Sequence, residues 1–478
     1  MDSSSVQFIL FGLAVAILSN FSSSRIWRSA VLMLASLIFI GLLAHNPVVL
    51  LPLAGFLLLG YAAFLLLSRG WNRALVWSVL VIVFAYIWLK KYTFLREGLF
   101  LQHSYFILGL SYIFFRVLHM LIEAREDSET HKAGLGAYLL YTLNFTTFVS
   151  GPIQHYDEFA RDQFADRPIH LGPRVVGLQL ERIVRGFFKV NVLAMLLHEV
   201  RLDALAQLSE PVPITLKMFS ALQLAVVYPL FLYANFSGYI DIVIALARLM
   251  RIRLPENFDR PFSASSFLDF WNRWHITLSS WLKTYVYNPL LLALMRRISS
   301  LSLQPYLGVF CFFVTFFLVG IWHGRTSEFA FFGVLQGGGV AVNKLWQLAM
   351  AGRLGRKRYK ALAANPIYVA FGRGLTFSWF AFTLFWFWSN WSQIGTIFSA
   401  LGFVTWFGVW LAVCLAATMV LAAWEWLRIK LLSIQTAEGP VLVSRYARVV
   451  YATGLGLVAF VVTMLLSQPA PPIVYKAF

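Results

Sequence analysis

Long uncharged runs of apolar residues are the feature that most constrains this chain. One of them extends from Tyr306 to Trp322 and ends at His323. Similar runs recur along the sequence and reach about 20 residues, the length that an α-helix needs to cross a membrane. None of them shows the ~10-residue alternation of apolar and polar residues that is typical of outer-membrane β-barrels. The pattern therefore predicts an all-α polytopic membrane protein.

Composition supports this class of protein. Hydrophobic residues make up 59% of the 478 residues and charged residues only 13%, whereas a soluble domain carries about 25% charged residues. Several apolar runs, above all 137–150 and 235–250, are shorter than a straight crossing requires, so we expect about ten to thirteen true crossings. The candidate spans are residues 6–20, 29–45, 47–67, 74–90, 103–122, 137–150, 184–199, 214–233, 235–250, 304–322, 329–348, 366–389, 400–427 and 448–467.

The net charge of +18 points to a membrane surface and not to nucleic acid. The Lys and Arg residues lie in short segments between the apolar runs, as expected for loops that stay on the cytoplasmic side of an inner membrane. The segment 351–360, AGRLGRKRYK, has five of them and is predicted to be a cytoplasmic loop. Residues 6–19 follow no basic segment and precede no small-residue cleavage site, so we expect a retained first span.

Motifs of soluble enzymes are absent from the sequence. It contains no G-x-S-x-G, no P-loop and no H-E-x-x-H, so phosphoryl transfer and zinc hydrolysis have no support. Cys311 and Cys414 both lie in apolar stretches. Two buried thiols make neither a disulfide framework nor a zinc site, and we expect no bound metal.

Polar and aromatic residues are concentrated between Tyr233 and Leu290. Within this segment, large side chains recur every three or four residues over 268–285, which predicts one helix. Its three tryptophans favour a position at the membrane interface. His275 lies at the edge of this stripe, where a histidine is more often structural than catalytic. The stripe consists of Leu268, Trp271, Trp274, Leu278, Trp281 and Tyr285, and Arg273, Thr277, Ser280 and Lys283 fall elsewhere on the helix.

Two polar features precede this helix. The segment 255–262, PENFDRPF, has a proline near each end, and Asn257 and Asp259 can hydrogen-bond the backbone of an irregular loop. Near a membrane such a loop must line a cavity or be buried in protein. Asp241 stands in the apolar run GYIDIVIALA. It needs a partner, for which we expect Arg248, Arg251 or a polar cavity, and a structural ion pair is the alternative to a functional role.

His323 is the stronger candidate for catalysis. It ends an uncharged span, and Gly324 after it is predicted to close the helix as a C′ glycine. A histidine between two spans can simply lie at the interface, but neutral imidazole is also the usual general base near pH 7. His275 and His323, from different elements, could converge on one cavity. In the following helix, Gln336 to Gly339 permits close backbone approach.

The sequence resembles the membrane-bound O-acyltransferase (MBOAT) family, in particular the bacterial branch that acylates alginate and teichoic acids. The resemblance covers roughly residues 140–350 and is specific as a set of motifs. These motifs are Ser150-Gly151-Pro152-Ile153, Asn235-Phe236-Ser237-Gly238-Tyr239 with Asp241, Asn257-Phe258-x-x-Pro261-Phe262, Phe270-Trp271-x-Arg273-Trp274-His275-x-x-Leu278-Ser279-x-Trp281-Leu282 and Gly320-Ile321-Trp322-His323-Gly324.

The resemblance implies a fold and a division of the chain. The fold is a single bundle over 1–478, a ring of tilted helices around a funnel that opens to the cytoplasm, with a tunnel to the other face. Residues 140–350 form the catalytic core, and 1–100 and 370–478 are peripheral helices. His323 matches the essential histidine of the family, and His275 matches a second position that is histidine or asparagine. Relatives of the alginate type often have a histidine at the position that matches Gln336.

The resemblance also implies a reaction. An acyl group, with acetyl as the preferred assignment, passes from a thioester donor (acetyl-CoA or an acyl carrier) across the bacterial inner membrane to an extracellular polysaccharide. His323 acts as the base or positions the acyl group, and an SGNH-type partner outside the membrane completes the transfer; no bound cofactor is implied. D-alanyl transfer from a carrier protein and transport without covalent chemistry are the alternatives. Substrate-binding residues are expected to be Trp322, Trp274, Ser279, Asn257, Arg273, Asn235 and Asp241.

Overall fold

The computed structural model describes residues 5–44, 46–101, 105–125, 130–436, 439–440, 444–466 and 471. They divide into two compact units, which are described separately. The first unit comprises the described residues of 1–190 and 236–256, and the second those of 191–235 and 257–471. The predicted single bundle and its central funnel stay predictions.

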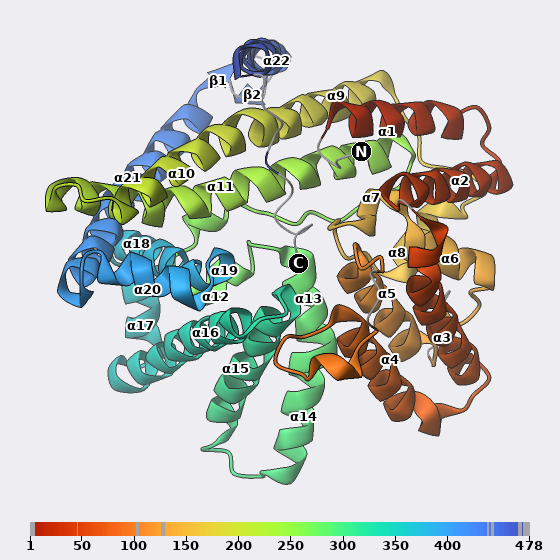
Figure 1. Cartoon of the computed structure of the whole chain (residues 1–478), viewed down its shortest axis with the longest axis horizontal. Coiled ribbons are helices and arrows are strands. Elements are labelled where there is room, and N and C mark those ends of the chain that lie inside the picture. The colour runs from red at the N-terminus through yellow and green to blue at the C-terminus, as the bar shows by residue number, and fades with distance from the viewer. Residues whose placement is uncertain are drawn as a thin grey trace. The chain divides into compact units, whose positions relative to one another are not determined.

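The first unit consists of helices (Figure 1). They are α1 (Val6–Ser19), α2 (Arg25–Leu43), α3 (Leu51–Ser68), α4 (Leu75–Lys90), α5 (Leu110–Glu123), α6 (Leu135–Leu143), α7 (Phe145–Phe148), α8 (Tyr156–Gln163), α9 (Pro173–Phe188) and the end of α11 (Ile214–Leu249). Short 3₁₀ helices occur at η1 (Pro47–Leu50), η2 (Asn72–Ala74) and η3 (Glu97–Leu99), and a π-helix, η4 (Lys189–Ala194), follows α9.

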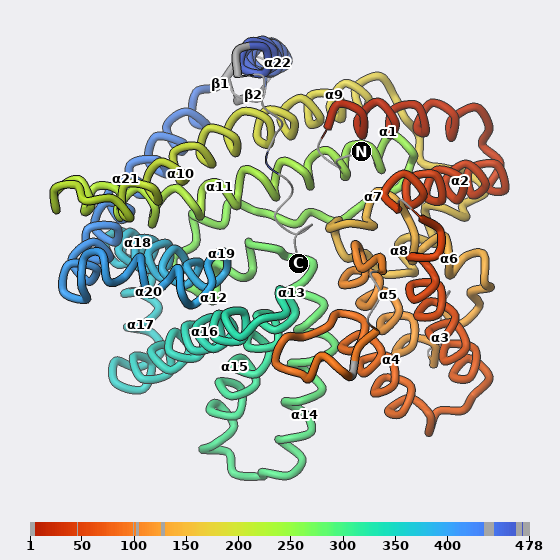
Figure 2. Tube along the Cα trace, viewed as in Figure 1, coloured from red at the N-terminus to blue at the C-terminus, as the bar shows by residue number. Residues whose placement is uncertain are grey.

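The second unit is also helical, apart from two paired strands of two residues each, β1 (Gln435–Thr436) and β2 (Gly439–Pro440). Its helices are α10 (Met195–Ser209), the first part of α11, η5 (Pro261–Ser263), α12 (Phe267–Trp271), α13 (Ile276–Leu282), η6 (Lys283–Tyr287), α14 (Asn288–Arg297), α15 (Gln304–His323), α16 (Ser327–Leu354), α17 (Arg356–Ala363), α18 (Pro366–Thr383), α19 (Phe385–Trp388), α20 (Trp391–Ser399), α21 (Phe403–Ser433) and α22 (Arg445–Leu466). Figure 2 follows the chain from α14 through a short connection into α15.

Seven helices of the described residues are long and apolar enough to cross a membrane: α2, α3 with η1, α4 with η2, α11, α15, α21 and α22. The predicted class, an all-α polytopic membrane protein, is therefore confirmed. The count of ten to thirteen crossings stays a prediction. The run 137–150 forms two short helices, α6 and α7, that meet at Asn144.

One predicted boundary is wrong. Residues 214–233 and 235–250 are not two spans, because α11 continues as one helix of 36 residues through Pro229 and Asn235. At about 1.5 Å per residue it extends over roughly 54 Å. The polar residues that suggested a break, among them Asn235 and Ser237, are buried in the protein. A helix satisfies its own backbone, so it can continue through such a segment.

The α15–α16 hairpin is packed at the distance that only glycine allows. A Cβ atom on Gly320 would lie 2.3 Å from Cα of Gly333, and one on Gly337 would lie 2.6 Å from the carbonyl oxygen of Phe313. The expected close approach around 336–339 is thus confirmed at Gly337. Because the backbones touch, α15 holds its last residue, His323, at a fixed place beside α16.

The basic segment 351–360 was predicted to be a loop, but it is helical. Residues 351–354 end α16 and 356–360 begin α17, so only Gly355, with φ of 77°, breaks the helix. All five basic side chains are exposed. A helix satisfies its own backbone hydrogen bonds even where it leaves the membrane, and the charges still face solvent or headgroups.

We expect this segment to face the cytoplasm. Gly352 is exposed, and a Cβ atom added there would meet nothing within 4 Å, so Gly352→Cys should fold normally. Because Lys and Arg are retained on the cytoplasmic side, a membrane-impermeant maleimide should label this cysteine only after the membrane is opened. Cys311 and Cys414 are buried, which makes the parent the unlabelled control. Labelling of Gly352→Cys in intact cells would reverse the orientation.

Candidate active site

His275 lies at a break between two helices of the second unit. The predicted continuous helix over 268–285 is wrong, because α12 ends at Trp271 and α13 begins at Ile276. His275 adopts left-handed backbone angles, φ 46° and ψ 52°, which few residues other than glycine do. The Trp271, Trp274 and Trp281 side chains of the stripe are nevertheless all buried.

Backbone pairing with the preceding loop explains the break. The N–H of Ile276 donates to the carbonyl of Asn257 at 3.0 Å, and the N–H of Asp259 donates to the carbonyl of Arg273 at 2.9 Å. Phe258 and Trp274 form an antiparallel bridge between these two bonds. The hydrogen bonds that would have continued the helix therefore go to the loop 257–259 instead.

Asn257 determines the tautomer of His275. The Oδ1 atom of Asn257 accepts hydrogen bonds from the backbone N–H and the hydroxyl of Thr277, at 3.1 and 2.9 Å. Since a backbone N–H can only donate, the amide oxygen must face this side. Nδ1 of His275 lies 3.3 Å from the same oxygen, so Nδ1 carries the proton. The Nε2 atom is then unprotonated and can act as an acceptor or a base.

His275 is neutral at physiological pH. Its side chain is fully buried, and it lies outside the seven helices that can cross a membrane. Burial disfavours the charged imidazolium and lowers the pKa of His275 to about 3. The residue therefore offers a neutral imidazole of fixed orientation and not a cation.

A single indole ring contacts both histidines. The ring of Trp322 lies 6.2 Å from the ring of His275 and 4.8 Å from that of His323, between centroids. His323 is 3% exposed and also contacts Phe332 of α16 and Phe387 of α19, at 6.1 and 5.2 Å. The two predicted catalytic residues therefore belong to one buried aromatic cluster.

Gly324 has a different role from the one predicted. Its backbone is extended, with φ of −153° and ψ of 171°, so it is not a left-handed C′ glycine. A Cβ atom at Gly324 would lie 2.0 Å from Cδ2 of Phe329. The absence of a side chain lets Phe329 pack directly after His323, where it also contacts Phe387 at 5.6 Å.

Gln336 adds a buried polar group one helical turn from Phe332. Its side chain is fully buried, and its Nε2 donates to the hydroxyl of Thr383 at 2.7 Å. That hydroxyl donates in turn to the carbonyl of Phe380. Gln336 Oε1 has no hydrogen-bond partner among the described residues. At this position of the second unit, where relatives of the alginate type often have a histidine, the chain therefore has an amide that does not titrate.

Among the other predicted substrate-binding residues, Ser279 keeps its capacity for a ligand. It lies on α13, one turn after His275, and its buried hydroxyl has no partner among the residues that the structure describes. Trp274 instead packs within an aromatic cluster, 5.1 Å from both Phe258 and Phe380. Ser279 is therefore the better donor for a substrate oxygen.

Arg273 and Asn235 are already engaged. The guanidinium of Arg273 forms ion pairs with Asp269 at 3.0 Å and Asp259 at 3.8 Å. The amide of Asn235 donates to the carbonyl of Pro471 at 3.5 Å. These contacts stabilise the connections around α12 and α11, and a role of the two residues in substrate binding stays a prediction.

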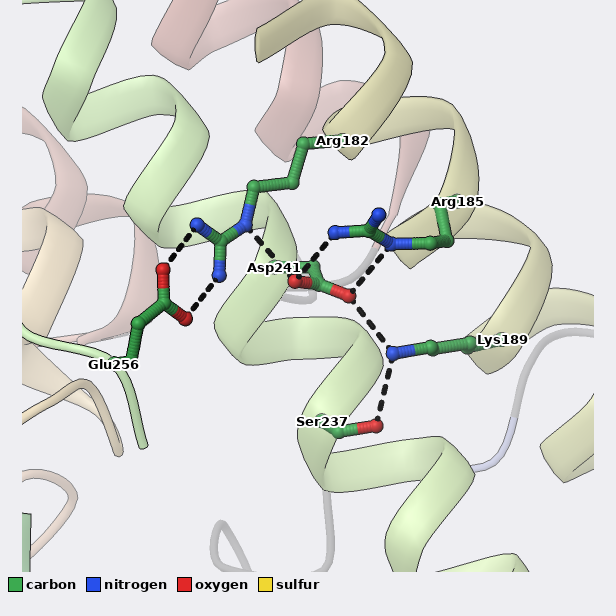
Figure 3. A network of polar contacts seen from close by, with 6 residues as sticks. All are labelled: Arg182, Arg185, Lys189, Ser237, Asp241 and Glu256. Carbon is green, nitrogen blue, oxygen red and sulfur yellow. Dashed lines mark hydrogen bonds and ion pairs between the residues drawn. The ribbon is translucent and has the colours of Figure 1, made fainter. Parts of the chain in front are cut away.

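Asp241 lies in the first unit, on α11, and three cations of the segment after Pro173 surround it (Figure 3). Its carboxylate accepts from Arg182 at 2.9 Å, Arg185 at 3.3 Å and Lys189 at 2.8 Å. Arg182 also forms a two-pronged ion pair with Glu256, at 2.7 and 2.6 Å. Both carboxylate oxygens of Asp241 are thus bound by protein cations, which supports a structural ion pair.

The predicted partners of Asp241 were wrong. Arg251 follows the end of α11 and donates to Asn20 at 2.6 Å, and Arg248 forms no ion pair among the described residues. Two helical turns separate residues 241 and 248 by about 10.5 Å along the axis. Cations on a neighbouring helix can therefore lie closer to Asp241 than cations two turns along its own helix can.

One group of possible metal ligands occurs among the described residues: His119, Glu123 and His155 of the first unit. His119 Nε2 accepts the N–H of Tyr156 at 2.9 Å, so its proton is on Nδ1, which faces Glu123 at 3.9 Å. A metal ligand normally donates from its second nitrogen to an acceptor. The second nitrogen of His119, Nε2, instead accepts a hydrogen bond, so we assign no metal to this group of residues.

The sequence profile of the MBOAT, membrane-bound O-acyltransferase family, matches residues 53–373. The chain belongs to this family. The matched region contains the predicted core, 140–350, and all the candidate residues above.

Curated relatives differ in their acceptors. Over 286 residues the chain is 32% identical to a teichoic acid D-alanyltransferase of Streptococcus thermophilus, which covers 57% of this chain and 65% of the relative. It is 32% identical over 216 residues to a peptidoglycan O-acetyltransferase of Helicobacter pylori, or 44% and 38% of the two chains. A probable alginate O-acetylase of Pseudomonas aeruginosa is 28% identical over 249 residues, or 51% and 44%. The chain thus spans between about two fifths and two thirds of the length of these relatives.

Proposed function

We propose that this multi-pass membrane protein is an O-acyltransferase of the bacterial inner membrane. It takes an acyl group, acetyl in our preferred assignment, from a thioester donor on the cytoplasmic side and passes it on for O-acetylation of an extracellular polysaccharide. The observation that carries the proposal is the buried His323 and the neutral His275 on one indole ring, in a chain of the MBOAT family.

The proposed chemistry uses His323 as a general base. It removes the proton of an acceptor hydroxyl as the oxygen attacks the thioester carbonyl, a C–O bond forms, and the C–S bond breaks. The proton then passes to the leaving thiolate, so His323 is regenerated. Proton transfer by a positioned base is worth about 10²–10⁴ in rate. The unprotonated Nε2 of His275 and the Ser279 hydroxyl are the groups that we expect to orient the reactants.

The donor and the later partner are separate molecules in this proposal. Acetyl-CoA or an acyl carrier supplies the thioester, and an SGNH-type protein outside the membrane receives or transfers the acyl group. The relatives named for alginate and peptidoglycan support a polysaccharide acceptor. The family match, and relatives that are named as transferases, favour covalent chemistry over transport alone.

D-alanyl transfer is the second candidate. The match to the teichoic acid D-alanyltransferase of Streptococcus thermophilus covers more of this chain, 57%, than the matches to the two O-acetylating relatives do. The acyl group therefore has to be identified directly.

Isotope labelling identifies the acyl group that is transferred. Cells with and without the gene receive ¹³C-acetate or ¹³C-D-alanine, and mild base releases esters from the extracellular polymers for mass spectrometry. We expect acetyl ester to be lost in the deletion strain and restored by the parent gene, but not by His323→Ala. Loss of D-alanyl ester would select the second candidate, and unchanged esters of both kinds would refute acyl transfer to a polymer.

A further inference from the structure

Arg201 is a half-buried cation of the second unit for which the described residues supply no anion. It lies on α10, and its guanidinium carbon is 5.7 Å from the ring centroid of Tyr228 and 5.3 Å from that of Trp388. Those two rings are 5.6 Å apart. Over the part of the chain that the structure describes, Arg201 forms no ion pair with a carboxylate. Among the described residues, the guanidinium is thus held by two aromatic rings and one neutral histidine, and by no carboxylate.

This arrangement is costly as it stands. Nε of Arg201 is buried and has no hydrogen-bond partner among the described residues, and burial lowers the pKa of the guanidinium. A buried charge is ordinarily paired and hydrogen-bonded. Arg182, Arg185 and Lys189 of the first unit follow that rule, because all three contact Asp241. Arg201 does not follow this rule, because it contacts no carboxylate among the described residues and its buried Nε has no hydrogen-bond partner there.

His198 supplies a second donor beside it. Nη2 of Arg201 lies 3.4 Å from Nδ1 of His198. Since a guanidinium can only donate, Nδ1 is the acceptor and the proton of the neutral imidazole is on Nε2. The guanidinium lies over the rings of Tyr228 and Trp388, and a guanidinium is planar and carries its N–H donors around its edge. That edge matches the oxygens of a carboxylate or a phosphate.

The short helix α19 connects this cation to the candidate active site. Phe387 contacts the ring of His323 at 5.2 Å, and the next residue, Trp388, stacks on Arg201. Successive residues of one four-residue helix therefore contact the proposed base and the cation. An oxyanion at Arg201 would therefore be bound beside the same short helix that contacts His323.

We propose that Arg201, with His198, binds a carboxylate or phosphate of the acceptor and so places an acceptor hydroxyl near His323. The ligand is an anionic saccharide unit; only its identification as the acceptor rests on the proposed function. The adjacency of Trp388 to Phe387 favours a reacting molecule over a lipid headgroup, which would need no contact with the base.

Anion binding can be measured without any acyl transfer. The full chain is purified in a zwitterionic detergent, and its tryptophan fluorescence and thermal unfolding are followed while phosphate or glucuronate replaces chloride at constant ionic strength. We expect a saturable response to both oxyanions and none to glucose. Since hydrogen bonds to charged groups contribute about 1.5–3 kcal/mol, Arg201→Met should weaken binding about tenfold to a hundredfold. The affinity of Arg201→Lys should lie between those of the parent and of Arg201→Met, because lysine keeps the charge and loses the planar edge.

The control is Arg356→Met, which removes an exposed arginine of α17 and should bind both oxyanions as the parent does. An equal loss in Arg356→Met and Arg201→Met would reduce the effect to net charge and overturn the proposal. If Arg201→Met does not accumulate, the parent still tests the proposal. A parent that shows no saturable response to either oxyanion has no such site. A response to vesicles of anionic lipid, with none to free phosphate or glucuronate, would assign Arg201 to a headgroup instead.

His323→Ala separates this inference from the proposed function. It should lose acyl transfer and keep the affinity of the parent for both oxyanions, because Arg201, His198 and Trp388 are unchanged. If neither the parent nor this variant acylates anything but both bind, the site stands and the reaction is wrong. Acylation at the parental level in Arg201→Met, over a range of acceptor concentrations, would show that the acceptor does not use Arg201.

Discussion

His323→Ala is expected to abolish acyl transfer while the protein remains in the membrane. The imidazole ends α15, is 3% exposed and lies against the indole of Trp322. Loss of a general base should cost about 3 kcal/mol or more in transition-state stabilisation, a factor of about 10²–10⁴ in rate. The measurement is the ester content of the extracellular polymer in cells that lack the parent gene, with immunoblots of the membrane fraction.

Burial makes a second variant necessary. From the sequence, a position at the membrane interface was the alternative for this residue, but its side chain is buried and packs against Phe332 and Phe387. Truncation to alanine therefore leaves a cavity, which costs stability. His323→Gln fills more of the space and keeps hydrogen-bonding groups, yet it cannot accept a proton at neutral pH. It should be as inactive as His323→Ala and better retained.

His170→Ala is the matched control, because His170 is exposed and its removal should leave acylation and membrane level unchanged. Near-parental acylation by His323→Gln, at equal membrane level, would remove His323 from the mechanism. Inactivity of all three variants would show instead that the assay responds to any change in histidine content.

Local pattern predicted the helices and failed at their ends. The apolar runs that became α2, α3, α4 and α15 were identifiable because length and hydropathy are properties of one segment. The break between α12 and α13 was not, since the spacing of tryptophans over 268–285 continues through it. It depends on hydrogen bonds between 273–276 and the loop 257–259, and no periodicity records such a partner.

The candidate site was predicted in its residues and not in its contacts. His275, His323, Trp322 and Asn257 were all named, but the role of Asn257 depends on Thr277 N–H, which fixes the orientation of the amide. Asp241 was correctly expected to need a cation, and the cations came from another helix. Arg201 and Trp388 were missed entirely, because they are 187 positions apart (388 − 201) and neither stands in a motif.

The second large effect is expected at His275. His275→Ala should reduce acylation strongly, whereas His275→Asn should retain more of it. Asparagine can donate from its amide to Oδ1 of Asn257, as Nδ1 of the histidine does. It also tolerates the left-handed backbone, φ 46°, better than alanine does. Acylation and membrane level are measured as for His323. Equal activity of parent and His275→Ala would return this residue to a purely structural role.

The pH dependence of stability tests whether His275 is neutral in the folded protein. Burial lowers its pKa to about 3, while an unfolded histidine titrates near pH 6.5. Between these values the unfolded chain binds a proton that the folded protein does not, so the free energy of unfolding falls as the pH falls below about 6.5. Above that pH this contribution is fully present and constant.

His275→Asn removes this one titration and leaves the other groups in place. From pH 6.5 to pH 4.5 the parent should lose about 2–3 kcal/mol more stability than the variant, since one pKa unit corresponds to about 1.4 kcal/mol. Thermal unfolding in detergent at several pH values gives the comparison, and the two curves should converge in shape above pH 7. Parallel curves over the whole range would mean that His275 is protonated alike in both states. The lowered pKa of the buried imidazole, and with it the neutral His275 at pH 4.5 to 6.5, would then be wrong.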